Sequence, residues 1–301
     1  MKTSAVIVTY NRLEMLKEVI TALQNSATPV SHIIVVDNAS DEPTQHYLRG
    51  LGSEIDYLRL ETNIGGAGGF NAGIRHFMEN TNDEFVWLMD DDTIPHPDTL
   101  QSLLDFSETV SDFGFLASDV RWTDGHRTKM NNPAPKGSLK RVPENQETPV
   151  ELLNATFVSL LMSRKIICQI GLPISEFFIW GDDIEYTERA SRVAPGYFVP
   201  AAKVTHKMAT NVGSNIMIDD MDRVGRYYNS YRNKIYYGKK RPFLGRMKSD
   251  ARIAIDLVKL ISTPNISQRQ ARLKIMLKGI VDGLKFKPVI EFASTDKPET
   301  R

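Results

Sequence analysis

The chain contains the octapeptide FVWLMDDD at residues 85–92, in which five apolar residues run directly into three aspartates. The apolar part has the length and composition of a buried β-strand. Adjacent carboxylates repel one another, so Asp90, Asp91 and Asp92 indicate either a solvated acidic turn or a site for a cation. Mg2+ and Mn2+ prefer carboxylate oxygens and often share them with the phosphates of a substrate. We therefore expect this stretch to be a strand that ends at the functional site.

The residues before this strand alternate between short β-branched runs and helical patterns of apolar residues. We expect strands at residues 5–10, 32–36 and 55–60, and helices at 12–25, 43–50 and 70–80, with Asn11 as the cap of the first helix. Such alternation predicts an α/β fold with a mostly parallel sheet covered by helices on both faces. Farther on we expect a helix at 98–110, a strand at 113–120, a short helix at 163–170 closed by Gly171 and an edge strand at 196–204. The polar stretch 122–148 is expected to be a mobile loop of the kind that often forms a lid.

Polar residues follow every expected strand of the first ninety residues, namely Thr9 to Arg12, Asp37-Asn38, Asn63 to Gly66 and Asp90 to Asp92. The carboxyl ends of parallel strands lie at one edge of a sheet, where α/β proteins bind their ligands. One binding site explains four such ends better than four unrelated caps and turns.

The glycine-rich residues 63–69 let backbone approach a ligand closely, and the N–H groups of the helix that follows favour anions. A flexible turn would have the same composition. The glycine spacing matches neither a dinucleotide fingerprint nor the phosphate loop of a nucleoside triphosphatase.

A second run, FFIWGDDIEYTERA at residues 177–190, delivers two adjacent carboxylates to an expected helix start. Asp182 or Asp183 can serve there as a cap, because the helix dipole stabilises acids at an N-terminus. The alternative is a general base, since a carboxylate against aromatic surface is desolvated and accepts a proton more readily. His206, after the last expected strand, is either a structural histidine or a third cation ligand beside the acidic triplet.

The composition is that of a globular protein, with 41% hydrophobic and 25% charged residues among 301. The single cysteine, Cys168, excludes internal disulfides and is typical of a reducing compartment. No signal peptide and no run of about 18 apolar residues is visible. We therefore expect a cytoplasmic protein without a membrane span.

The net charge of zero conceals an asymmetry: residues 1–222 hold 18 Lys and Arg against 31 Asp and Glu, whereas residues 223–290 hold 17 against 3. We expect two domains, residues 1–220 and 221–301. The second contains tyrosine-rich basic sequence and helical patterns at 243–261 and 267–284, which are typical of a segment on an anionic membrane surface. A solvated cap on the core, or a contact within a homo-oligomer, are the alternatives. Nucleic acid is not an expected partner, because no nucleic-acid-binding module is visible.

Together these motifs resemble the inverting nucleotide-sugar transferases of glycosyltransferase family 2, which have the GT-A fold. The resemblance covers residues 5 to about 210 and rests on VIVTYNR at 6–12, VVDNAS at 35–40 and the acidic triplet. The runs NIGGAGGF at 63–70 and FIWGDDIEY at 178–186 look most like the galactofuranosyltransferase and rhamnosyltransferase branch. The implied fold is a GT-A α/β fold with a Rossmann-like nucleotide-binding half, followed here by the basic helical segment.

The resemblance also implies a role for each matching residue. Those that would hold the nucleoside are Thr9, Tyr10, Arg12 and Asp37, and those along the nucleotide diphosphate are Asn63, Gly65 and Gly66. Those that would bind a divalent cation, Mn2+ or Mg2+, are Asp90, Asp92 and His206, with Asp91 near the ribose or donor sugar. Asp183 would be the general base, and Trp180 and Asp182 would line the acceptor pocket.

The implied activity is metal-dependent, inverting transfer from UDP-galactofuranose to a hydroxyl of a lipid-linked or polysaccharide acceptor in cell-surface polysaccharide synthesis. The place implied is the cytoplasmic face of the cell membrane. The chain lacks the long N-terminal β-domain of the larger galactofuranan polymerases, so transfer of one residue is expected. The alternative donor is dTDP-rhamnose. A non-catalytic nucleotide-sugar- or glycan-binding protein would not need Asp183, and a nucleotidyltransferase would carry Arg and Lys in a glycine-rich loop directly after its first strand.

Overall fold

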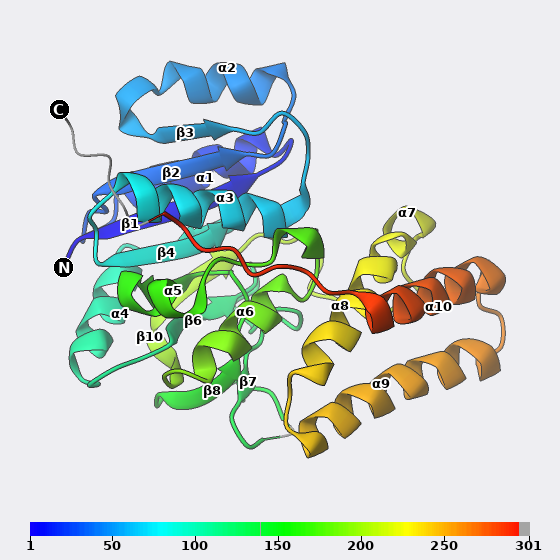
Figure 1. Cartoon of the computed structure of the whole chain (residues 1–301). Helices are drawn as coiled ribbons and strands as arrows, with labels where there is room; N and C mark the ends of the chain where they lie inside the picture. The colour runs from blue at the N-terminus through cyan, green and yellow to red at the C-terminus, as the bar shows by residue number, and fades with distance from the viewer. Residues whose placement is uncertain (139, 295–301) are drawn as a thin grey trace.

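The computed structural model describes residues 1–138 and 140–294, and its centre is a ten-stranded sheet (Figure 1). The strand order is β3-β2-β1-β4-β9-β6-β10-β8-β7, with β5 paired to β10. The strands are β1 Thr3–Thr9, β2 His32–Asp37, β3 Asp56–Arg59, β4 Phe85–Asp90, β5 Thr93–Pro95, β6 Phe115–Arg121, β7 Ala134–Pro135, β8 Val150–Asn154, β9 Leu160–Ser163 and β10 Gly196–His206. The helices are α1 Leu13–Gln24, α2 Glu42–Gly50, α3 Gly65–Asn80, α4 Thr99–Glu108, α5 Arg164–Ile170, α6 Asp182–Ser191, α7 Met221–Val224, α8 Arg226–Lys239, α9 Phe243–Ser262 and α10 Arg269–Lys285, with 3-10 turns at Gly52–Glu54 and Ser175–Phe177.

The first four major strands are parallel, as the alternation of strands and helices predicts. β1 pairs with β2 and β4, and β2 pairs with β3. Alternate residues of β1 face opposite layers: Val6 and Val8 pack in the cluster that contains α3, whereas Ala5 and Ile7 pack with α1 (Figure 1). The register places Thr9 beside Asp37 and Val8 beside Asp90. The polar strand ends therefore share one edge of the sheet.

The second half of the sheet is mixed. β9 is antiparallel to β4 and to β6, and β10 is parallel to β6 and antiparallel to β8 and β5. The expectation that residues 196–204 form an edge strand is wrong, because β10 lies between β6 and β8. Its pairing with β5 puts His206 in register with Thr93, directly after the acidic triplet.

Helix α3 begins at Gly65 and not near residue 70, so most of the glycine-rich run belongs to a helix and is not a loop. The glycines allow this helix to lie close to β1. A Cβ on Gly69 would stand 2.4 Å from Val8, and one on Gly73 would stand 2.4 Å from Val6. Much of this glycine pattern therefore serves helix–sheet packing and not a ligand.

The C-terminal helices α8 to α10 pack around a cluster of their own that includes Tyr231, Leu260 and Met276 (Figure 1). The helices expected at 243–261 and 267–284 are confirmed as α9 and α10. The chain then returns to the α/β body, where the backbone N–H of Leu172 donates to the carbonyl of Glu291 at 2.8 Å. The last part of the expected second domain, residues 295–301, lies outside the described residues, and the division into two domains stays a prediction.

Candidate functional site

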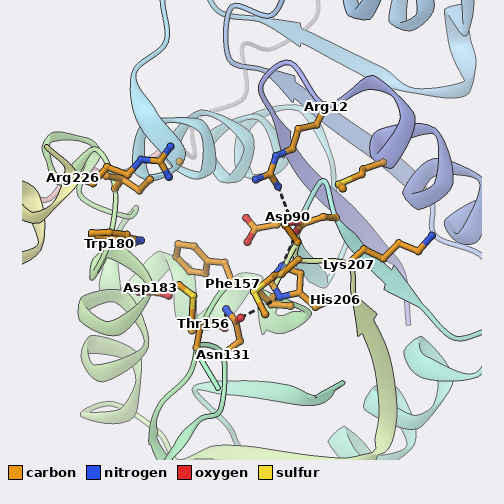
Figure 2. Close-up of a pocket in the computed structure, with 18 of the residues that line it drawn as sticks. Arg12, Asp90, Asn131, Thr156, Phe157, Trp180, Asp183, His206, Lys207 and Arg226 are labelled. Atoms are coloured by element: carbon orange, nitrogen blue, oxygen red, sulfur yellow. Dashed lines mark hydrogen bonds and ion pairs between the residues drawn. The ribbon is translucent and has the colours of Figure 1, made fainter. Parts of the chain in front are cut away.

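A cavity of about 890 Å³ opens at the carboxyl edge of the sheet, and its lining includes residues of the first turn of α6 and of the segment that leads into α8. Figure 2 shows the side chains around it. It gathers many of the residues that the sequence singles out. Those that line it are Arg12, Gly66, Asp90, Asp92, Trp180, Asp182, Asp183 and His206. The two constellations at residues 90–92 and 180–183, far apart in sequence, thus face one space.

Asp90, Asp92 and His206 form a compact group of donor atoms. One ligand atom from each lies within 4.8 Å of the others, and His206 Nε2 stands 2.8 Å from Asp92 Oδ1. Strand pairing explains the proximity, since β5 and β10 run side by side and the N–H of Lys207 donates to the Asp92 carbonyl at 2.9 Å. Two carboxylates and an imidazole are suitable ligands for Mn2+ or Mg2+ with open positions for a phosphate.

The other imidazole nitrogen of His206 is held by Asn131, whose side-chain oxygen lies 3.1 Å from Nδ1 (Figure 2). An amide oxygen accepts, so Nδ1 donates to Asn131, while Nε2 donates to Asp92 at 2.8 Å and would exchange that proton for a bound cation. Such outer partners orient metal-binding histidines. Asn131 lies in the long polar stretch 122–148, where the sequence gives no sign of its role.

The electrostatics of the triplet favour a bound cation. Burial, followed by repulsion from Asp92, raises the pKa of Asp90 to about 7, and burial raises the pKa of Asp91 to about 6. Burial also acts to raise the pKa of Asp92, but the hydrogen bond and charge of His206, together with Arg12, outweigh it and lower that pKa. A divalent cation would relieve the repulsion among these carboxylates. The residues present therefore fit such an ion.

Arg12 and Asp91 support the triplet from the side of β1. Arg12 Nη1 lies 3.2 Å from Asp91 and 2.6 Å from Asp92, and Thr9 Oγ1 donates to Asp91 at 2.8 Å. Asp91 is 4% exposed. In this arrangement Asp91 binds Thr9 and Arg12, while the nucleoside and sugar contacts expected of these residues and of Tyr10 stay predictions.

The polar residues at the end of β2 and just before α3 form hydrogen bonds with other protein groups. Asp37 is fully buried and accepts hydrogen bonds from Tyr57 at 2.9 Å and from Arg59 at 2.5 Å. The N–H of Gly65 donates to Asn63 Oδ1 at 2.9 Å. Among the expected nucleotide-binding residues, Arg12 and Gly66 line the cavity. The others are not among its described lining residues, namely Thr9, Tyr10, Asp37, Asn63, Gly65 and Asp91.

The loop that carries the second pair of acids has an unusual backbone. Phe178, Trp180 and Gly181 have φ angles of 63°, 66° and 93°, in the left-handed region that side chains other than glycine rarely adopt. Gly181 occupies the N-cap position of α6, so neither Asp182 nor Asp183 is the cap residue and both stand in the first turn. Such strain persists only where the surroundings hold it in place, and it clusters at functional sites.

Both acids are desolvated. Burial, followed by the charge of Asp183, raises the pKa of Asp182 well above its usual value. Burial raises the pKa of Asp183 to about 6, against the opposing effects of a 2.7 Å hydrogen bond from the N–H of Ile184 and of the charge of Arg141. At neutral pH Asp183 is therefore a carboxylate with more basicity than a solvated one.

Asn233 in α8 fixes this strained loop. It is fully buried, and its side-chain N–H groups are shared among the carbonyls of Trp180 at 2.8 Å, Phe177 at 3.0 Å and Ile179 at 3.3 Å. Tyr227, also in α8, meets the Trp180 ring edge-on at a centroid distance of 5.0 Å. The C-terminal helices therefore position the loop that carries Asp183. In the sequence, residues 226–239 show only a basic and aromatic composition, which contains no signal for this contact.

Replacing Asn233 with aspartate should damage the site without removing a catalytic group. Aspartate has the same shape but donates no hydrogen bond, so three buried carbonyls lose their donor and face a negative charge. We expect a loss of roughly 1–3 kcal/mol in the free energy of unfolding and a fall in kcat of up to about 10²-fold, the effect of misplacing a reacting group. Chemical unfolding and turnover measure the two. Asn229→Asp, one turn earlier in α8, is the control, and equal effects of both variants would contradict the assigned contact.

Comparison with known proteins identifies the family of this chain. The model described as Glycosyl transferase family 2 matches residues 4–171, from β1 to the end of α5. Galactofuranosyltransferase GlfT1 of Mycobacterium tuberculosis is 30% identical over 250 residues, which cover 77% of this chain and 80% of GlfT1. The galactofuranosyltransferase GlfT1 of Mycolicibacterium smegmatis is 27% identical over 248 residues, covering 77% of this chain and 81% of that relative.

Solved structures share the fold. GalNAc-T7 with UDP, GalNAc and Mn2+ superposes with a TM-score of 0.63 at 12% identity, and TarS of S. aureus with a TM-score of 0.55 at 16% identity. Each match covers 95% of this chain, which spans only 56% of the GalNAc-T7 chain and 44% of the TarS chain. The expected GT-A fold is thereby confirmed. With a family model that spans more than half of its residues, the chain belongs to glycosyl transferase family 2.

Proposed function

We propose that this glycosyltransferase moves a hexose from a nucleotide-sugar donor to a hydroxyl group of a saccharide acceptor, with inversion at the anomeric carbon. One observation carries the proposal: Asp183 and the group formed by Asp90, Asp92 and His206 line the same cavity. A cation-binding group suits a diphosphate leaving group, and a basic carboxylate suits a hydroxyl nucleophile.

Each residue has a part in a single displacement. Asp183 accepts the proton of the acceptor hydroxyl while the oxygen of that hydroxyl attacks the anomeric carbon. The bond from the anomeric carbon to the diphosphate oxygen breaks in the same step. No covalent sugar–enzyme intermediate forms, so the configuration inverts. Asp90, Asp92 and His206 would hold a divalent cation, which supplies Lewis-acid neutralisation of the departing diphosphate. Arg12 keeps the carboxylates of Asp91 and Asp92 in position.

UDP-galactofuranose is the donor that the relatives favour. Two of them carry the name galactofuranosyltransferase, and a related fold has been solved with UDP-GlcNAc. A donor panel tests this with the full chain and Mn2+: UDP-galactofuranose, UDP-galactopyranose, UDP-glucose, UDP-N-acetylglucosamine and dTDP-rhamnose, read by thermal shift and donor hydrolysis. We expect a cation-dependent response to UDP-galactofuranose. A response to dTDP-rhamnose alone would indicate a rhamnosyltransferase. No response to any donor would contradict the proposed enzymatic function.

The pH dependence of kcat should report Asp183. A general base works as the carboxylate, so activity belongs to the form present above its pKa of about 6. We expect kcat to be level above that pH and to fall about tenfold per pH unit below it. The measurement is kcat at saturating donor, acceptor and Mn2+ between pH 5 and 8 (roughly the range in which such a group titrates). A profile that stays flat down to pH 5 would contradict the role of Asp183.

We also propose that α9 rests on an anionic membrane surface, at the cytoplasmic face of the cell membrane, where a lipid-linked acceptor would be available. Within the described residues, no helix combines the length and apolarity needed to cross a bilayer. One face of α9 packs inward through Ser249, Ile253 and Leu260. The opposite face exposes apolar side chains every three or four residues, namely Leu244, Met247, Ala251, Ile255, Val258 and Ile261.

The basic residues beside this apolar face favour an anionic membrane as its partner. Residues 243–285 carry nine Lys and Arg against three Asp, and Lys248, Arg252 and Lys259 are exposed along α9. An apolar stripe bordered by cations is the pattern of a helix that lies in the interface of an anionic bilayer.

Liposome flotation tests the membrane proposal. The wild-type protein should float with vesicles that contain phosphatidylserine at low salt and not with pure phosphatidylcholine vesicles. Val258→Glu, which places a charge at a position 62% exposed, should abolish flotation, whereas Val193→Glu at an exposed position of the body should not. Loss of a dimer in Val258→Glu, with flotation unchanged, would assign the stripe to a second copy of the chain instead.

A further inference from the structure

The cavity must accept a doubly charged diphosphate, yet its wall is rich in acids. Asp90, Asp92, Asp182 and Asp183 all line it. Two of the cations that line it are already paired with protein carboxylates. Arg12 binds Asp91 and Asp92, and Lys207 binds Glu18. Neither is free to give its full charge to a phosphate.

The start of α3, which the sequence offered as an anion site, is largely used by the protein itself. Three of the four N–H groups from Ile64 to Ala67 donate to protein oxygens: Ile64 to Asn38 at 2.9 Å, Gly65 to Asn63 at 2.9 Å, and Ala67 to the carbonyl of Phe178 at 3.1 Å. A phosphate group in this cavity therefore needs another source of positive charge.

Two arginines on the opposite wall meet that need. Arg223 and Arg226 both line the cavity, and in the part of the chain that the structure describes neither side chain has a hydrogen bond or ion pair with another residue. Gly225, between α7 and α8, has helical φ and ψ angles, so the two arginines stand three residues apart on one helical turn and share a face. Figure 2 places Arg226 beside Trp180, across the cavity from Asp90 and Arg12.

The position of this pair is fixed by its neighbours. Tyr227, next to Arg226, packs against Trp180 and donates a hydrogen bond to Asp219 at 2.7 Å. Asp219 is thereby engaged by a tyrosine and also lies beside Arg272, which donates to its carbonyl at 2.9 Å. The pair is thus held at the rim of the cavity, on the side where the loop of Asp183 enters.

We infer that Arg223 and Arg226 form a phosphate-binding pair that completes the substrate site from the C-terminal side. The inference rests on the proposed glycosyl transfer and deepens it by naming residues that the family motifs do not include. The phosphate has two sources with the same chemistry: the diphosphate of the donor, or a phosphate that links a saccharide acceptor to lipid. Arginine suits either, because its planar guanidinium binds phosphate through paired hydrogen bonds.

Calorimetry with the full chain separates the two sources. The proteins are wild type, Arg223→Ala/Arg226→Ala, and Arg192→Ala as a control at an exposed arginine at the end of α6, outside the described lining. The ligands are UDP, uridine, and inorganic pyrophosphate added to protein saturated with UDP, all with Mg2+ present. A donor site predicts that the double variant loses affinity for UDP by roughly 10-fold or more per arginine and keeps its affinity for uridine. Arg192→Ala should match wild type.

An acceptor site predicts a different pattern. UDP would bind the double variant normally, and pyrophosphate would bind the UDP complex of the wild type but not that of the variant. Equal affinities of wild type and double variant for UDP and for pyrophosphate would overturn the inference and leave the proposed function standing. A wild-type protein that binds neither UDP nor uridine would overturn both. Arg223→Lys/Arg226→Lys, which keeps the charge but not the fork of donors, should fall between wild type and the alanine variant.

Discussion

Replacing Asp183 with asparagine is expected to lower kcat by a factor of roughly 10²–10⁴, the usual contribution of one acid–base group. Asparagine has nearly the shape of aspartate but cannot take up the proton of the acceptor hydroxyl. The loop should keep its conformation, because Asn233 holds it through the carbonyls of residues 177–180 and not through the acid. Donor affinity should therefore change little. Turnover at saturating substrates, together with the Kd of UDP, gives the two values.

The neighbouring Asp182 provides a comparison that tests whether the effect on kcat is specific to Asp183. Burial raises the pKa of Asp182 well above its usual value, so Asp182→Asn removes a carboxyl group that is a poorer candidate for the carboxylate base. We expect a smaller loss from that variant, seen mainly in the KM of the acceptor, if Asp182 lines the acceptor pocket as the family resemblance implies. Asp112→Asn, at an exposed ion pair with Lys165, is the control for handling and folding. If Asp182→Asn loses more kcat than Asp183→Asn, the base is Asp182 and the assignment of roles must be exchanged.

The sequence predicted the first half of the fold because its signals are local. Each strand from β1 to β4 is a short apolar run, each helix has a 3.6-residue pattern, and parallel pairing then brings the ends of the strands together without further information. The cation-binding group also follows from this logic. Asp90 and Asp92 lie at the end of one expected strand, and His206 lies at the end of another. The only further inference needed is that these two strand ends lie close together in the sheet.

The errors have a common physical cause: the sequence shows composition but not what packs against it. The sequence predicts that the glycine-rich run precedes a helix from about residue 70, yet α3 begins at Gly65, and Gly69 and Gly73 are small because α3 lies against Val8 and Val6. The sequence predicts β10 at an edge because no further strand follows it. Its partner β8 comes earlier in the chain, and α5 and α6 lie between the two strands in the sequence. Asn11 was expected to cap α1, but its side chain instead accepts the N–H of Asp41 at 2.7 Å.

The residues that the sequence missed act through contacts that span many positions. Asn131 reaches His206 over 75 residues, and Asn233 reaches Trp180 over 53. A polar residue of ordinary type in a loop or in a basic helix carries no periodicity and no motif, so only the three-dimensional structure can assign it a partner. For the same reason α8, which reads in the sequence as part of a surface segment, proves to hold the loop of the expected base.

Removal of divalent cations is expected to abolish turnover, and a graded series of variants should trace the effect to His206. Alanine in place of Asn131 leaves the ligands but frees the imidazole, so the Mn2+ concentration for half-maximal activity should rise by about 10–100-fold, the usual effect of losing an outer partner. His206→Ala removes a ligand and should raise it further. The matched control is His126→Ala, at a largely exposed histidine outside the described lining of the cavity.

The order of these effects is the informative part, because a structural histidine would give a different one. If His206 served only to anchor β10 against β5, its loss would lower the free energy of unfolding and leave the Mn2+ requirement of the folded protein unchanged. If it binds the cation, the Mn2+ titration of the folded protein shifts as well, in addition to any loss of stability from its contact with Asp92. Direct Mn2+ binding, followed by the electron paramagnetic resonance of the free ion, separates affinity from turnover. Full activity of the wild type in excess chelator would contradict the cation site. Arg12 and His206 alone would then offset the negative charge of Asp90 and Asp92.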